Sequence, residues 1–142
     1  MADSRFNFND DTLRQIAADV LAQARAKGAT AADTELTESI GQTVTVRHDE
    51  VETIEYTRDK GLAVSVYIGN QRGHASTSDL TPQAVRDTVE KALTIAKFTA
   101  ADDCAGLADE ELLARDFPDL QLYHPWGLTV EQAIDMARAC EA

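Results

Sequence analysis

The spacing of hydrophobic residues near the start of the chain predicts an amphipathic helix. Apolar residues recur three and four positions apart, which places them on one side of a 3.6-residue period: Leu13, Ile16, Ala17, Val20, Leu21 and Ala24. Asn9, Asp10 and Asp11 supply capping oxygens and negative charge for the first turn. Lys27 and Gly28 are typical of a helix end, so the helix is expected to stop there.

A strand-rich block follows, because the pattern changes from helical spacing to alternation. Short strands are predicted over 32–37, 43–47, 52–57, 62–68 and 74–78. Turns are expected at 48–50, 58–61 and 69–73. Ile54 and Tyr56 are expected to face inward, and Gly69 and Gly73 are both free to take a positive φ. The last strand is polar and is expected near an edge of the sheet.

Two more helices are predicted from capping signals. Thr81 and Pro82 form a cap followed by proline at the first helical position, and the buried stripe is expected to hold Val85, Val89, Ala92, Leu93 and Ala96. Thr129 and Gln132 fit a capping box, and the last helix would bury Val130, Ala133, Ile134 and Ala137. A short helical turn is expected over 109–113, and 117–126 is expected to be extended and aromatic.

These elements predict an α+β fold. The expected architecture is a twisted, mainly antiparallel sheet of about four or five strands packed with two helices. We expect an amino-terminal domain over 1–98, a linker rich in Ala, Asp and Gly over 99–116, and the beginning of a second domain over 117–142. The last helix reaches Ala142 without a closing cap, so the chain is expected to stop inside a larger protein.

Composition and charge narrow the function classes. With 44% hydrophobic and 27% charged residues, the composition is globular. The 13 Lys and Arg against 25 Asp and Glu give a net charge of −12, which argues against direct nucleic-acid binding because phosphate binding needs a positive field. No apolar run is long enough for a membrane helix, and the first residues lack the regions of a signal peptide. We therefore expect a cytoplasmic protein without membrane contact.

The histidines and cysteines do not predict a metal site. His48, His74 and His124 have no helical zinc-ligand spacing, and Cys104 and Cys140 lie outside any C-x-x-C motif. Ordinary surface histidines and two ordinary thiols explain these residues best. An unrelated small enzyme that uses His74 or His48 stays open as an alternative, although no spacing supports it.

The hydroxyl groups near His74 do not predict a catalytic set either. Ser76, Ser78 and Asp79 lie close to it in sequence, but neighbours on a strand point to opposite faces. Ser78 and Asp79 are better explained as the start of a helix, and no nucleophile-elbow motif is present. The loop over 69–73 is too short for a phosphate cradle and is followed by a strand instead of a helix.

Two further groups of residues are considered as candidates for a functional role. Three carboxylates gather around one hairpin, where a solvated strand face is the expected role: Glu50, Glu52 and Glu55. Three aromatic residues lie near the linker, either as a partner-facing patch or as the start of a second core: Phe117, Tyr123 and Trp126. The core is favoured, because aromatic side chains supply the largest buried area.

Four stretches carry a family resemblance. They are 49–52 (DEVE), 73–80 (GHASTSDL), 104–109 (CAGLAD), and 118–120 (PDL) with 123–125 (YHP). Their order and spacing resemble the amino-terminal part of the PmbA/TldD family, historically called modulators of DNA gyrase, and the last two are more similar to the PmbA (TldE) branch. Asp49 departs from the glycine that the family favours, but aspartate tolerates the left-handed region, so a tight turn is expected to survive.

The resemblance implies a heterodimeric, zinc-dependent peptidase of the bacterial cytosol, formed by PmbA-like and TldD-like chains. Its implied substrates are unfolded or small peptides, including peptide antibiotic precursors and antitoxins. The implied zinc site belongs to the TldD-like chain, in an H-E-x-x-x-H helix with a further cysteine. No His-Glu dipeptide occurs here, so no catalytic, cofactor-binding or metal residue is assigned to this chain, and zinc is expected in the TldD-like partner.

The expected role is therefore a non-catalytic scaffold or wall of a substrate cavity. The polar strand over 74–78 suggests the hypothesis that an extended peptide adds to it as a strand. The expected partners are a TldD-like subunit and peptide substrates. The alternative is a protein-binding regulatory module, for example one that acts on DNA gyrase, without a peptidase role.

Overall fold

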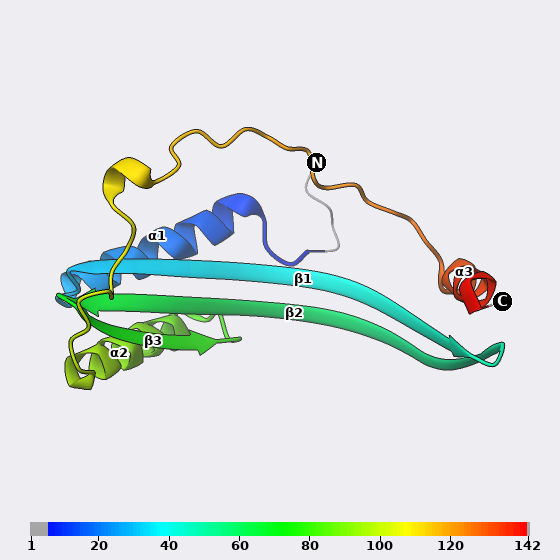
Figure 1. Ribbon diagram of the computed structural model, residues 1–142, viewed down its shortest axis with the longest axis horizontal. Helices are drawn as coiled ribbons and strands as arrows, with labels where there is room; N and C mark the ends of the chain where they lie inside the picture. Colours follow the sequence, from blue (N-terminus) through cyan, green and yellow to red (C-terminus); the bar gives the residue numbers. More distant parts are fainter. Residues whose placement is uncertain (1–5, 142) are drawn as a thin grey trace. The chain divides into compact units, whose positions relative to one another are not determined.

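The computed structural model describes residues 6–141. In chain order the elements are α1 (Asp10–Ala26), β1 (Ala31–Arg47), β2 (Glu50–Ile68), β3 (Gln71–Thr77), α2 (Pro82–Phe98), the 3₁₀ turn η1 (Glu110–Leu112) and α3 (Val130–Glu141) (Figure 1). The strands form one antiparallel sheet in the order β1-β2-β3. The predicted α+β class is confirmed. Within residues 6–141 the sheet has three strands, slightly fewer than expected.

The strand count is lower because four predicted short strands merge into two long ones. The turn expected at 58–61 is wrong, since β2 continues through Arg58, Asp59 and Lys60, whose side chains are exposed. β1 and β2 approach each other closely next to this segment, because Gly41 of β1 has no side chain. A β-carbon placed there would lie 2.7 Å from Thr57 Oγ1 of β2. A charged triplet followed by glycine therefore lies here in a solvated strand instead of a turn.

The two hairpin turns each need a left-handed backbone. His48 and Asp49 have φ values of 53° and 64°, the pattern of a type I′ turn, so the predicted tolerance of Asp49 is confirmed. Gly69, with a φ of 57°, opens the β2–β3 turn. Gly73 does not take a positive φ, because it lies inside β3 and not in the turn.

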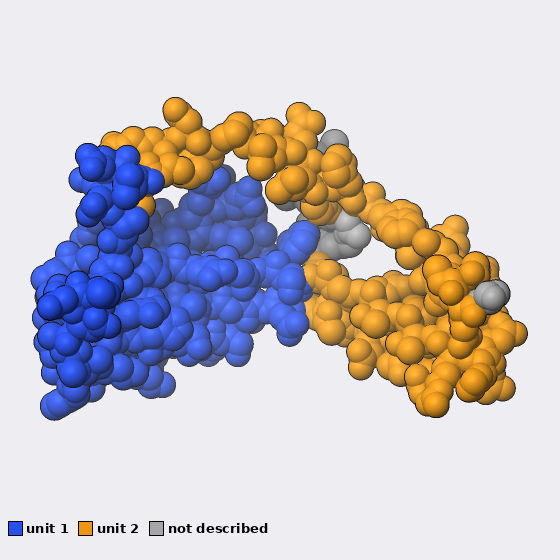
Figure 2. Space-filling model, in the orientation of Figure 1, with its two compact units in different colours: residues 1–39, 59–112 blue, residues 40–58, 113–142 orange. Residues whose placement is uncertain are grey.

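One compact unit holds residues 1–39 and 59–112, described from Phe6 onward (Figure 2). Both α1 and α2 pack on the sheet face that carries Leu62, Val64 and Val66. The helices complete the core with Val20, Ala24, Val85, Val89, Ala92, Leu93 and Ala96. All five core residues predicted for the second helix are thus buried.

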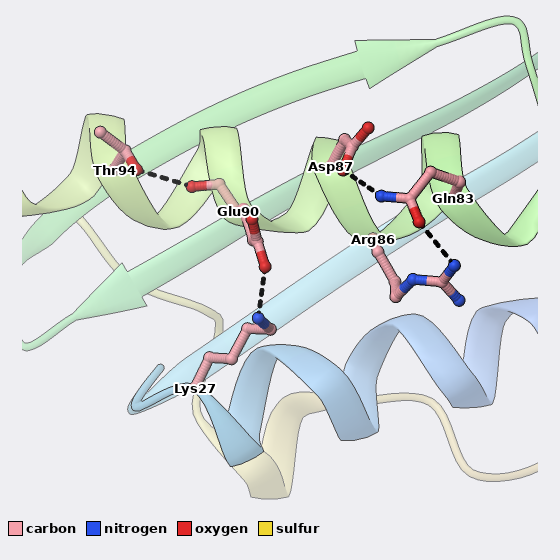
Figure 3. Close-up of polar contacts among 6 residues, drawn as sticks. All are labelled: Lys27, Gln83, Arg86, Asp87, Glu90 and Thr94. Atoms are coloured by element: carbon pink, nitrogen blue, oxygen red, sulfur yellow. Dashed lines mark hydrogen bonds and ion pairs between the residues drawn. The ribbon is translucent and has the colours of Figure 1, made fainter.

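The caps of both helices are present as predicted. The Asn9 side chain accepts a hydrogen bond from Thr12 N at 2.8 Å, and Thr81 Oγ1 accepts one from Ala84 N at 3.4 Å. Lys27 Nζ of α1 lies 2.5 Å from Glu90 Oε1 of α2 (Figure 3). Both side chains are about half exposed, so this ion pair contributes little stability.

The second compact unit holds residues 40–58 and 113–142, described as far as Glu141. It contains the outer part of the β1–β2 hairpin and α3. The capping box is confirmed, since Thr129 N donates to Gln132 Oε1 at 3.0 Å and Gln132 N donates to Thr129 Oγ1 at 3.2 Å. The predicted α3 face is right in position, but its members are only half-buried: Val130, Ala133, Ile134 and Ala137.

Two predictions of burial in this unit are wrong. Ile54 and Tyr56 are 44% and 67% exposed, because a two-stranded ribbon has no continuous layer over it. The aromatic segment does not form a core in this chain, since its three aromatic side chains are each more than half exposed: Phe117, Tyr123 and Trp126. Every fully buried hydrophobic residue of the described chain lies in the first unit.

Candidate functional site

The histidines singled out in the sequence are spread over different elements. His48 lies in the hairpin turn and His124 in the extended segment, both within the second unit, whereas His74 lies on β3 in the first. Cys104 and Cys140 are free and exposed. Among residues 6–141, no three His, Cys, Asp or Glu side chains gather in an arrangement that would hold a metal ion.

A polar cluster does form on the sheet face that lies opposite the two helices. The β2–β3 register pairs Ser65 with His74, and Ser65 Oγ lies 3.2 Å from His74 Nδ1. Arg72 donates from Nη2 to the same hydroxyl oxygen at 3.2 Å. Ser65 is only 4% exposed, so these contacts satisfy a buried hydroxyl. The signal in the sequence was a single serine between two valines of an apolar strand.

The Ser65–His74 pair has the composition of a nucleophile and a base, but not the surroundings that the chemistry needs. Arg72 occupies the serine oxygen, and neither cavity beside β3 is lined by Ser65 or His74. Nucleophilic catalysis needs a base that is oriented by a third group and an open space for the substrate. The pair is therefore better explained as a structural contact between two strands.

The other polar residues after β3 build the start of α2, as predicted. Asp79 N donates to Thr77 Oγ1 at 3.0 Å, and Asp79 Oδ1 accepts from Thr81 N at 2.8 Å. The hydrogen bonds from Thr81 hold the pKa of the Asp79 carboxyl below its ordinary value. This carboxylate is thus part of the helix cap and not of a catalytic group.

The acidic residues of the hairpin are solvated, as expected. Glu50, Glu52 and Glu55 are all exposed, and Glu52 lies 3.6 Å from Arg47 across the hairpin. In the β2–β3 turn, Gly69 N donates to Thr30 Oγ1 at 3.0 Å, and the carbonyl oxygen of Asn70 accepts from Asp102 N at 3.1 Å, so both backbone groups have partners within the protein.

The turn of the β1–β2 hairpin is held by α3. The carboxylate of Glu141 accepts from His48 N at 2.6 Å and from Asp49 N at 2.8 Å. Two successive amides with left-handed dihedral angles converge on one anion in this way. Arg138 Nε donates to the Asp49 carbonyl oxygen at 3.0 Å and lies 3.3 Å from its carboxylate. These four contacts, which join His48 and Asp49 of the turn to Arg138 and Glu141 of α3, form a clasp.

The edge of β3 is the feature with the clearest capacity to bind a partner. β3 is the last strand of the sheet in the described chain, and it begins directly after a two-residue turn, with Ile68 opposite Gln71. The pair that flanks such a turn is hydrogen-bonded, and hydrogen-bonded pairs then alternate along the ladder. Residues 71, 73, 75 and 77 therefore bond to β2, and the backbone groups of Arg72, His74 and Ser76 point outward.

Two cavities lie at the two ends of β3. A cavity of about 300 Å³ near its start is lined mainly by Tyr67, Asn70, Arg72, Thr99, Asp102 and Cys104. A wider one of about 620 Å³ near its end is lined by Glu35, Thr37, Lys60, Ser76, Thr77 and Ser78 among others. The wider cavity includes residues of β1, β2 and β3, so it lies across the sheet and not at the free edge of β3 alone.

The comparisons with known proteins agree on one family. A family model described as PmbA/TldA metallopeptidase domain 1 matches residues 32–96. The chain is 46% identical over 115 residues to a protein named metalloprotease PmbA homolog from Haemophilus influenzae, covering 81% of this chain and 26% of that protein. It is 45% identical over 121 residues to metalloprotease PmbA from Escherichia coli O157:H7, covering 85% and 26%.

Solved structures share the fold. A putative modulator of DNA gyrase from Bacteroides thetaiotaomicron matches with a TM-score of 0.80 and 25% identity, over 92% of this chain and 30% of that one. TldE from Thermococcus kodakarensis matches with a TM-score of 0.58 and 15% identity, over 62% and 20%, which supports the fold alone. The chain belongs to the PmbA/TldD family and resembles the amino-terminal region of its PmbA members. It spans about a quarter of the length of the curated relatives that it matches.

Within residues 6–141, no helix combines the length and the apolar character needed to cross a bilayer.

Proposed function

We propose that this chain is the amino-terminal, non-catalytic part of a PmbA (TldE)-like subunit in a zinc-dependent peptidase complex that acts on unfolded or small peptides. The observation that carries the proposal is the 45–46% identity to proteins named metalloprotease PmbA, over about a quarter of their length, together with the match to a family model described as domain 1. In this proposal a TldD-like partner supplies the zinc ion and the catalytic groups. The complex acts in the cytoplasm.

The residues of this chain support a scaffold role within that complex. The sequence has no His-Glu dipeptide, and the strongest nucleophile–base pair is occupied by Arg72. The buried core lies in the unit that also holds β3. A firm sheet with an open edge is suited to hold an extended chain near a reaction that another subunit performs.

The experiment that tests this proposal is a binding assay with two candidate partners. The protein that contains this chain is co-expressed with an affinity-tagged TldD-like subunit, and in parallel with tagged DNA gyrase. We expect co-purification in an equimolar complex with the TldD-like subunit and none with gyrase. An unrelated acidic protein of similar net charge serves as the control for non-specific retention.

A gyrase-binding role is the alternative with an observation in its favour. The similar structure from Bacteroides thetaiotaomicron is described as a putative modulator of DNA gyrase, and the net charge of −12 suits a basic protein surface. Retention on gyrase without retention on the TldD-like subunit would overturn the peptidase proposal and favour this second function.

A further inference from the structure

We propose that the free edge of β3 and the adjoining side of α2 form a groove that binds an extended peptide as a fourth strand, with its apolar side chains toward Ile95 and its acidic side chains toward Arg72. This inference rests on the proposed function, because it assigns the surface of this chain that would hold a peptide substrate. Three features of the molecule support the groove: the backbone of β3, the side of α2 and the charges that border it.

The backbone of β3 supplies the hydrogen bonds. The outward groups of Arg72, His74 and Ser76 offer three donors and three acceptors in a row. Groups on alternate residues of a strand recur about every 6.6 Å, and only another extended backbone matches that spacing over several residues. This surface therefore selects a strand and does not read its sequence directly.

The side of α2 supplies an apolar wall. The backbone of α2 lies against Gly73, since a β-carbon there would collide with the carbonyl oxygen of Ala92. The opposite side of the helix faces α1, where Lys27 pairs with Glu90 (Figure 3). Helical periodicity turns Ile95 away from Glu90 and toward the β3 side.

The apolar side chains of this wall are exposed to solvent in the described chain. Ile95 is 46% exposed and Phe98, one turn further on, is 87% exposed. In Figure 1, α1 lies along β1 and α2 lies along β3, so this side of α2 borders the free edge of the sheet. A peptide strand at that edge would place alternate side chains against Ile95.

The charges decide which peptide fits. Arg72 is exposed on the open face of β3, and Lys91 is exposed on the same side of α2 as Ile95. Asp87 lies one turn before Lys91 on the same side of α2 and offsets its charge, so Arg72 supplies the positive charge at the groove of a chain whose net charge is −12. Alternation in a strand sends one set of peptide side chains toward α2 and the other toward Arg72. The best occupant is therefore an extended peptide that alternates apolar and acidic residues.

The test uses a fluorescein-labelled peptide of about eight residues that alternates valine and glutamate, with binding to the whole chain measured by fluorescence anisotropy. Two derivatives carry N-methyl groups, either on all the valines or on all the glutamates. Only one set of amides faces β3 in an added strand, so we expect one derivative to lose binding by more than about tenfold and the other to keep it. Equal binding of both derivatives would overturn the proposal.

Variants of the chain test the same groove from the protein side. His74→Pro removes one outward N–H without a loss in the ladder to β2, whereas His74→Ala keeps that donor and serves as its control. Ile95→Glu places a charge where the apolar side chains of the peptide would lie, and Thr94→Glu places the same charge on a different side of α2. We expect binding to fall about tenfold in the first member of each pair and to stay within about twofold in the second.

The outcomes separate this inference from the proposed function. Loss of binding in both members of a pair, with the circular dichroism spectrum intact, would contradict the groove. The N-methylated peptides keep the test decisive if His74→Pro does not fold. The complex with the TldD-like subunit is measured separately, so a failed groove with an intact complex overturns only this inference.

Discussion

The backbone of Gly73 in β3 lies directly against the backbone of Ala92 in α2. A β-carbon on Gly73 would overlap the Ala92 carbonyl oxygen and lie 2.5 Å from Ala96 N, so no side chain fits between strand and helix. Because both contacts are backbone atoms, a rotamer change cannot relieve the overlap. This glycine sets the distance between the sheet and the helix that covers it.

We expect Gly73→Ala to destabilise the fold by about 1–3 kcal/mol, the usual cost of overpacking, with α2 displaced from β3. Gly106→Ala is the matched control, since nothing lies within 4 Å of a β-carbon there. Urea denaturation of both variants measures the effect. Equal midpoints for the two variants would show that the strand and the helix are not packed as described.

The clasp between α3 and the hairpin turn should protect the backbone amides of the turn from hydrogen exchange. Glu141→Ala removes the acceptor of the His48 and Asp49 amides, so we expect hydrogen exchange at these two amides to accelerate. The global free energy of unfolding should fall by no more than about 1 kcal/mol, because the groups are exposed. Asp135→Asn, a change of an exposed α3 carboxylate, should leave both amides unchanged.

The cap of α2 predicts a pH dependence. Hydrogen bonds from Thr81 lower the pKa of Asp79 in the folded state, so the carboxylate adds stability above its unfolded pKa, and this stability is lost as the pH falls through the folded pKa. Asp79→Asn should therefore lower the melting temperature at neutral pH. The difference from the parent chain should shrink toward about pH 2, and a difference that grew with acid would contradict the assignment.

Because the fully buried hydrophobic residues lie in the first unit, shortening a side chain should lower stability much more there than in the extended segment. Leu62 is 1% exposed between the sheet and the helices, so Leu62→Ala should cost about 2–5 kcal/mol. Leu122 in the extended segment is 81% exposed, and Leu122→Ala should stay within about 0.5 kcal/mol. Thermal unfolding of both variants checks this contrast. Similar losses would show that the extended segment is packed in solution.

The sequence predicted best where local chemistry decides the structure. The caps at Asn9, Thr81 and Thr129 each depend on a hydroxyl or amide oxygen one turn from a free backbone N–H, and all three formed. The core stripe of α2 followed from helical spacing alone. In each case the deciding groups lie within four residues of each other, so no knowledge of the distant chain was needed.

The predictions failed where distant contacts decide the structure. The charged run at Arg58 suggested a turn, but pairing with β1 keeps the strand extended. The alternation at Ile54 and Tyr56 indicated a buried face, yet burial depends on a layer that covers it. The polarity of β3 predicted that it lies at an edge of the sheet. The Ser65–Arg72 contact could not be predicted, because it depends on the register between β2 and β3. The domain boundaries expected after residues 98 and 116 stay a prediction.

The central claim is that this chain supports a reaction carried out by groups outside it. The most direct measurement is the zinc content and the chelator-sensitive hydrolysis of an unfolded peptide, compared in this chain alone, in a TldD-like subunit alone and in the two together. The account predicts that zinc follows the TldD-like subunit and that this chain alone neither retains the metal after dialysis nor cuts the peptide. Equimolar zinc and hydrolysis in the isolated chain would contradict it.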